Sequence, residues 1–180
     1  MDVKAVTKAT RILKNMPRTG WLQKEIPSHE AETVAEHTFE VALITLAFAL
    51  KLNDKIDREK ALTMALVHDL SESVLGDTPK ALTERLSEKV KHMIECETVK
   101  NITGSEGIRK IFEEYANGES LEAKIVKIAD KLSTILQAKN YRNRGYNVDE
   151  IVETTKIDLL EALKQLEDKN IVETVHNLIE

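Results

Sequence analysis

The fold is decided by one stretch of the chain, residues 33–52, which reads TVAEHTFEVALITLAFALKL. After His37 most of its residues are apolar. A run of this length and composition is typical of a helix that is buried on most of its circumference. We therefore predict that residues 33–52 form the central helix of the fold.

Composition indicates that the rest of the chain is helical as well. Of 180 residues, 42% are hydrophobic and only 4% are aromatic, and Gly (6) and Pro (3) are few. This balance favours long helices with an aliphatic core over strands and turns. The length corresponds to one domain of about 150 residues. We predict an all-α fold, a single helical bundle.

The spacing of apolar residues predicts where the other helices lie. They are expected over about 2–15, from Asp57 onward, around Leu82–Ile94, over 105–115, over 120–135, and near 148–167 and 169–179. Residues 17–32 contain two prolines and a glycine and have no apolar period. They predict a loop that is long enough to suggest a functional role.

Charge and composition also exclude several classes of protein. Lys plus Arg total 26 against 31 Asp plus Glu, a net charge of -5, so no broad basic surface for duplex nucleic acid is expected. The longest uncharged apolar run, Val41–Leu50, is far shorter than the roughly 20 residues that span a bilayer, so we expect no membrane partner. Cys96 is the single cysteine and the N-terminus has no apolar signal region, which leads us to expect a cytoplasmic protein.

Four residues of metal-ligating type stand in otherwise apolar helical surroundings. His37 opens the stretch quoted above, His68 and Asp69 follow one another, and Asp130 interrupts a later apolar helix. An ionised carboxylate near a core is costly unless a cation lies beside it. A mixed set of imidazole and carboxylate groups suits Mn, Fe, Co, Ni or Zn.

Glu72 adds a further carboxylate to this group. It lies four residues after His68 and three after Asp69, and it shares their face if the helix continues for one more turn. A metal lowers the pKa of a bound water toward about 7, and a carboxylate within reach could exchange a proton with that water. Such an arrangement is typical of a hydrolase.

Each of these residues has a simpler interpretation when it is taken alone. His68 and Asp69 could form a surface salt bridge at a helix end, and Asp130 could pair with Lys127 or Lys131. Composition and spacing leave both the metal site and the structural interpretation open.

Four motifs carry a resemblance to a known family. They are TVAEHT at 33–38, ALVHDLSE at 65–72, GDTP at 76–79 and ADK at 129–131. In this order they resemble the HD-domain metal phosphohydrolases, and the PRTGW loop at 17–21 makes the chain similar to the 5'-deoxynucleotidase branch. The resemblance covers about residues 10–145. It implies one HD domain over 1–180, with a metal-binding core at about 30–140 and C-terminal helices at about 148–179.

The resemblance also implies roles for individual residues. A divalent cation (Mn, Co, Mg, Ni or Zn) would be held by His37, His68, Asp69 and Asp130. Glu72 would be the catalytic carboxylate.

Asp77 is a second catalytic candidate that the resemblance places near the phosphate. In some members of the branch the carboxylates at the positions of Glu72 and Asp77 hold a second cation. The alternative is that Asp77 is only a turn residue between Gly76 and Pro79.

Three residues are expected to bind the substrate. The resemblance implies that Arg18 meets the phosphate or sugar and that Trp21 lies beside the sugar or base. Lys131 is a further candidate for neutralising phosphate charge. Trp21 could instead anchor the loop in the core.

The predicted function is removal of the 5'-phosphate from nucleoside monophosphates, with deoxynucleotides favoured by resemblance only. The chain is expected to be a homodimer or a higher homo-oligomer. One alternative is an HD hydrolase of another nucleotide: a triphosphate, a cyclic nucleotide or a guanosine alarmone. The other is a binding protein whose metal only holds helices together.

Overall fold

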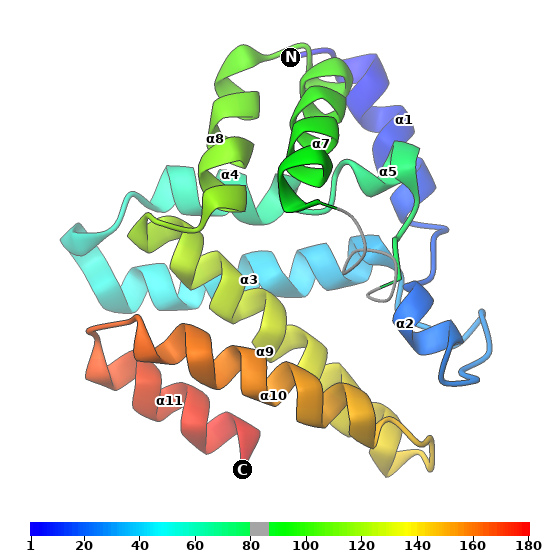
Figure 1. Cartoon of the computed structure of the whole chain (residues 1–180), viewed down its shortest axis with the longest axis vertical. Coiled ribbons are helices and arrows are strands. Elements are labelled where there is room, and N and C mark those ends of the chain that lie inside the picture. Colours follow the sequence, from blue (N-terminus) through cyan, green and yellow to red (C-terminus); the bar gives the residue numbers. More distant parts are fainter. Residues whose placement is uncertain (80–86) are drawn as a thin grey trace.

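The computed structural model describes residues 1–79 and 87–180 as a set of packed helices (Figure 1). In chain order these are α1 (Val3–Leu13), α2 (Thr19–Leu22), α3 (Val34–Leu52), the 3-10 helix η1 (Asn53–Lys55), α4 (Arg58–Val67), α5 (Glu72–Leu75), α7 (Glu88–Thr103), α8 (Glu106–Asn117), α9 (Leu121–Asn143), α10 (Asp149–Lys164) and α11 (Lys169–Ile179). The described residues contain no strand, only an isolated bridge between Pro17 and Thr33. The predicted all-α fold is confirmed.

The central helix is α9, which packs against α3, α4, α8, α10 and α11 and runs diagonally through the middle of the molecule (Figure 1). It contributes side chains to several apolar clusters. The expectation that residues 33–52 form the central helix, buried on most of its circumference, is wrong. Phe39, Leu43 and Leu50 of α3 are 66%, 50% and 57% exposed. The sequence of α3 is apolar on its outer face as well as its inner face, and only the inner face is covered by other helices.

Side-chain caps fix where the site-bearing helices begin. Thr33 and Glu36 form a capping box at the start of α3, and this places His37 in the first turns of that helix. Asp57 caps α4 and Ser120 caps α9, as their positions before apolar spacing predict.

Two local predictions differ from the structure. Residues 17–32 are not wholly irregular, because α2 lies inside them. The helix expected to run through His68 to Glu72 ends at Val67, and turns over 68–71 precede α5. Leu82 and Leu86, which mark the start of a predicted helix, lie outside the described residues. Among the described helices, none has the length and apolar character needed to cross a membrane.

Candidate metal centre

The predicted ligands come together where α3, α9 and the end of α4 meet. One donor atom each from His37, His68 and Asp130 lie within 4.8 Å of one another. His37 Nε2 is 3.0 Å from Asp130 Oδ1. Asp69 Oδ2 lies 3.1 Å from His68 Nε2 and 3.9 Å from His37 Nε2. The structure therefore gathers two imidazoles and two carboxylates into one group that could hold a divalent cation.

The orientation of His68 fits a metal ligand. Its Nδ1 lies 2.8 Å from the Ala65 carbonyl oxygen, which can only accept, so Nδ1 donates a proton there and Nε2 is the ring nitrogen that a cation would bind. Nε2 is buried, and its 3.1 Å contact with Asp69 Oδ2 does not meet hydrogen-bond geometry. A buried ring nitrogen that faces two carboxylates in this way is the environment a cation would complete.

The two carboxylates of the group are held ionised. Burial raises the pKa of Asp130, but the hydrogen bond with His37 and the charges of His37 and His68 outweigh burial and lower it below its ordinary value. The pKa of Asp69 is also lowered, because the charge of His68 and its contact with His68 outweigh burial. Both carboxylates are available as anionic ligands.

His68 holds a proton tightly in the absence of a cation. Burial lowers its pKa, but the charges of Asp69 and Asp130 and the contact with Asp69 raise the pKa to about 9. A cation has to displace this proton in order to bind Nε2.

Glu72 lies beside the group but in a different electrostatic state. Burial raises its pKa, and the charges of Asp69 and Asp77 raise it further, to about 10. The charge of Arg18 acts in the opposite direction and is too weak to prevent the rise. Glu72 therefore carries a proton at neutral pH in the metal-free protein.

Asp77 makes a structural bond that the sequence did not predict. Its Oδ2 accepts a hydrogen bond from the backbone N–H of Thr19, and its carbonyl oxygen accepts one from Thr19 Oγ1 at 2.9 Å. Asp77 thereby ties the segment after α5 to the start of α2. This bond agrees with the turn-residue interpretation, and its charge still acts on Glu72.

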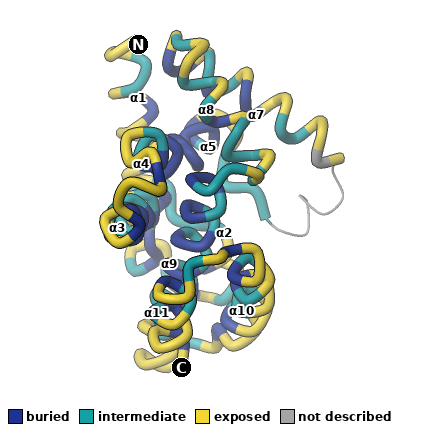
Figure 2. The backbone as a smooth tube through the Cα atoms, turned by 90° about the vertical axis from the view of Figure 1, so that its left-hand side faces the viewer, coloured by how far each residue is buried: buried dark blue, intermediate teal, exposed yellow. Residues whose placement is uncertain are grey.

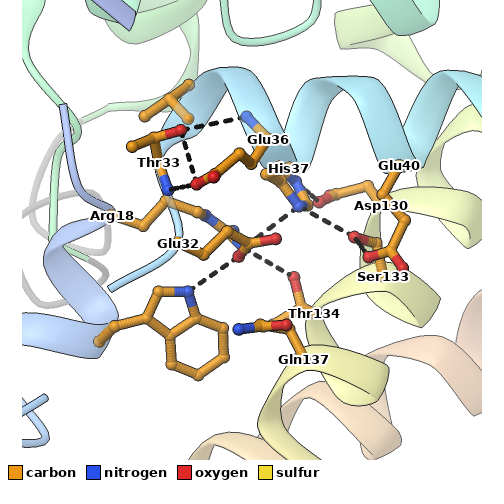
Figure 3. A network of polar contacts seen from close by, with 12 residues as sticks. Arg18, Glu32, Thr33, Glu36, His37, Glu40, Asp130, Ser133, Thr134 and Gln137 are labelled. Atoms are coloured by element: carbon orange, nitrogen blue, oxygen red, sulfur yellow. Dashed lines mark hydrogen bonds and ion pairs between the residues drawn. The ribbon is translucent and has the colours of Figure 1, made fainter. Parts of the chain in front are cut away.

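The loop places Arg18 beside the candidate metal ligands. Its Nη1 lies 3.3 Å from Glu32 Oε2, from Thr134 Oγ1 and from His37 Nδ1 (Figure 3). The charges of Glu32 and Asp130 keep the guanidinium protonated, because they outweigh burial and raise its pKa. Arg18 is thus a fixed positive charge next to the candidate metal site.

Trp21 occupies a different environment. It is only 2% exposed, and its Nε1 donates a hydrogen bond to Glu32 Oε2 at 2.9 Å. Its ring centroid lies 5.0 Å from that of Tyr141. These surroundings match the interpretation of Trp21 as a core anchor for the loop. A contact between Trp21 and substrate stays a prediction.

Lys131, a predicted substrate contact, is half-buried, and its charge acts on Asp130.

Several other residues around the site were not predicted from the sequence. Tyr115 of α8 lies with its ring centroid 6.0 Å from that of His68. Glu32 is the buried acceptor shared by the loop side chains, and Ser133 contacts His37 directly. The one signal for Ser133 is its position, three residues after Asp130 on the same helix face.

Comparison with known proteins places these features in context. Residues 10–167 match the HD domain family. The 5'-deoxynucleotidase HDDC2 of Danio rerio is 37% identical over 136 residues, which are 72% of this chain and 64% of that protein. The 5'-deoxynucleotidase hdd1 of Schizosaccharomyces pombe is 35% identical over 143 residues, 73% of this chain and 68% of that protein. A solved structure of a conserved hypothetical protein from Pyrococcus furiosus is 34% identical, with a TM-score of 0.82 over 96% of each chain. The chain thus spans just under two thirds of the zebrafish protein.

Proposed function

This chain belongs to the HD domain family, and we propose that it is a metal-dependent phosphohydrolase that removes the 5'-phosphate of deoxynucleoside monophosphates. One observation carries the proposal. Two imidazoles and two carboxylates lie close together, with the carboxyl group of Glu72 and the guanidinium of Arg18 beside them. The names of the relatives from Danio rerio and Schizosaccharomyces pombe support the deoxynucleotide substrate.

In this proposal His37, His68, Asp69 and Asp130 hold the cation, which is Mn, Co, Mg, Ni or Zn. When bound, it supplies Lewis-acid stabilisation of the phosphate charge and activates a water. Glu72 is the proposed catalytic carboxylate, and a second cation, if one is used, would be held by Glu72 and Asp77.

The remaining chemistry is assigned to protein side chains. Arg18 and Lys131 neutralise the phosphate in a protein of net charge -5. Glu72 holds a proton and transfers it to O5' of the substrate as water attacks phosphorus and the P–O5' bond breaks, and the resulting Glu72 carboxylate takes a proton back from the water that has added to phosphorus.

A screen of substrates tests this proposal. The purified protein, freed of metal and resupplied with Mn, Co, Mg, Ni or Zn, should release phosphate from deoxynucleoside monophosphates with a higher kcat/KM than from the ribonucleotides. A higher kcat/KM for a triphosphate, a cyclic nucleotide or an alarmone would overturn the proposed substrate and assign that nucleotide instead. Metal binding without turnover of any nucleotide would indicate a metal-stabilised binding protein.

We also propose that the whole chain is one domain and works as a homodimer in the cytoplasm. The packing of α10 and α11 on α9 supports one domain, and the single, buried Cys96 suits a reducing compartment. The dimer is supported by α3, which lies at the edge of the bundle and carries exposed residues along its length (Figure 2). Contiguous exposed apolar surface of this kind marks interaction sites.

The exposed stripe of α3 is suited to pairing with itself. Its members are Phe39, Leu43, Ala47 and Leu50, all exposed on one helix face. Two antiparallel copies centred on Leu43 would set the large ring of Phe39 opposite the small Ala47 of the second copy. We expect Leu43→Arg to convert a dimer to monomers in light scattering, whereas Leu178→Arg, at a 45% exposed position on α11, should leave the dimer intact. A Leu43→Arg protein that remains dimeric would place the interface elsewhere.

A further inference from the structure

We infer that Glu40 and Ser133 form a positioning pair that holds His37 with Nε2 directed at the proposed metal site. The inference rests on the metal site of the proposed function. It assigns a role to two side chains that do not themselves contact the proposed cation or the substrate.

The three residues form a short chain of contacts between α3 and α9 (Figure 3). Ser133 Oγ donates to Glu40 Oε2 at 2.6 Å, and the same Oγ lies 3.1 Å from His37 Nδ1. Ser133 and His37 are both fully buried. Water therefore cannot replace either partner easily, and the geometry of the contacts determines the state of the ring.

The position of each proton follows from donor and acceptor chemistry. A serine hydroxyl has one proton, and an ionised carboxylate can only accept, so the 2.6 Å contact takes the hydroxyl proton toward Glu40. The lone pairs of Ser133 Oγ then face His37, and the 3.1 Å contact requires a proton on Nδ1. With Nδ1 committed to Ser133, Nε2 is the ring nitrogen left for a cation, which would take the place of the 3.0 Å contact between Nε2 and Asp130 Oδ1.

Arg18 is a competing influence on the Nδ1 side of this ring. Its Nη1 is also 3.3 Å from His37 Nδ1, and a guanidinium can only donate, so it would favour the other tautomer, with the proton on Nε2. The same Nη1 lies within 3.3 Å of Glu32 Oε2 and Thr134 Oγ1, which are proper acceptors. Arg18 can therefore be satisfied without His37, whereas Ser133 Oγ, once its proton points to Glu40, needs a donor.

His37 and His68 thus both donate a hydrogen bond from Nδ1 and direct Nε2 at the proposed metal site, but they do so by different means. His68 donates from Nδ1 to a backbone carbonyl, while His37 uses a side-chain hydroxyl backed by a carboxylate. Only the second arrangement can be removed by substitution, which makes it testable.

The test uses Ser133→Ala and Glu40→Gln. The first removes the acceptor of the Nδ1 proton, and the second allows the amide to donate to Ser133, so that the hydroxyl can turn toward Nδ1. We expect the dissociation constant for Zn²⁺, measured on metal-free protein against a chromophoric chelator, to rise by about 10- to 100-fold in Ser133→Ala. The double variant should be no weaker than Ser133→Ala alone, since both substitutions act through one N–H.

A second readout separates positioning from a merely structural role. In the zinc-loaded wild-type protein the His37 Nδ1 proton should give a downfield, slowly exchanging NMR signal, and this signal should be lost in Ser133→Ala. Thr45→Val is the matched control, because Thr45 is fully buried on α3 and its Oγ1 has no hydrogen-bond partner among the described residues. It should change neither zinc affinity nor the signal.

Both readouts are independent of turnover, so they distinguish two kinds of failure. A wild-type protein that binds zinc but releases no phosphate would refute the proposed function and leave the positioning test valid. Zinc affinity in Ser133→Ala within about threefold of wild type, with the ring N–H signal retained, would overturn the positioning pair.

Discussion

Asp130→Asn is expected to abolish tight binding of a divalent cation and to lower phosphate release by about a thousandfold or more, which corresponds to roughly 4 kcal/mol of lost charge stabilisation. Asparagine keeps the shape and one oxygen of the side chain but removes the negative charge that lies 3.0 Å from His37 Nε2. The surrounding apolar clusters do not depend on this carboxylate. Helical content should therefore be unchanged.

Elemental analysis after dialysis, circular dichroism and phosphate release measure these three quantities. Asp54→Asn is the control, because Asp54 is exposed on η1, beyond the end of α3 that is far from His37. An Asp130→Asn protein that keeps full metal content would remove Asp130 from the ligand set. One that unfolds would favour a metal whose only role is to hold the helices together.

The same metal site should depend on pH with a defined sign. The raised pKa of His68, about 9, means that this ring is protonated below that value in the metal-free protein. A cation competes with this proton, so affinity should strengthen as pH rises toward about 9 and weaken as pH falls, by up to about tenfold per pH unit. Calorimetric titration at pH 6 and pH 8 in buffers of different ionisation enthalpy would show the affinity change and the proton released.

The proposed metal ligands stand out in the sequence because each is a charged or titratable group in or directly after an apolar helical segment. Such a group is costly unless something neutralises it, so His37, the His68-Asp69 pair and Asp130 stand out before any fold is known. Their convergence could not be derived from spacing, since they come from three separate parts of the chain. It was expected from the order of motifs.

The outer parts of the site could not be predicted, for physical reasons that differ from residue to residue. Glu40 and Ser133 lie three residues after a ligand, but polar residues at that spacing are equally common on solvent-facing helix surfaces. Glu32 is charged in a loop, where charge is ordinary, and its burial depends on Trp21 and Arg18 folding over it. The sequence shows that a segment is apolar but not which of its faces will be covered, and for this reason α3 was mistaken for the central helix.

Glu72→Gln is expected to separate binding from turnover. Its pKa of about 10 in the metal-free protein means that the wild-type carboxyl group holds a proton at neutral pH. A bound cation would lower that pKa toward the range where a proton can be both taken and returned. Glutamine fills the same volume and can neither lose nor donate an acidic proton, so kcat should fall by about a hundredfold to ten-thousandfold. Metal at the primary site should remain, because the four proposed ligands are unchanged.

Single-turnover phosphate release with excess enzyme isolates the chemical step, and calorimetry with a deoxynucleoside monophosphate in the same buffer and metal measures binding. Glu97→Gln, an exposed position on α7, is the matched control and should leave both unchanged. Near-normal turnover in Glu72→Gln would exclude proton transfer by this residue. Loss of primary-site metal would make Glu72 a ligand of that cation. Loss of a second, weaker cation alone would assign Glu72 to the second site with Asp77. In that case kcat should lack the change of about tenfold per pH unit that titration of a proton-donating Glu72 would produce.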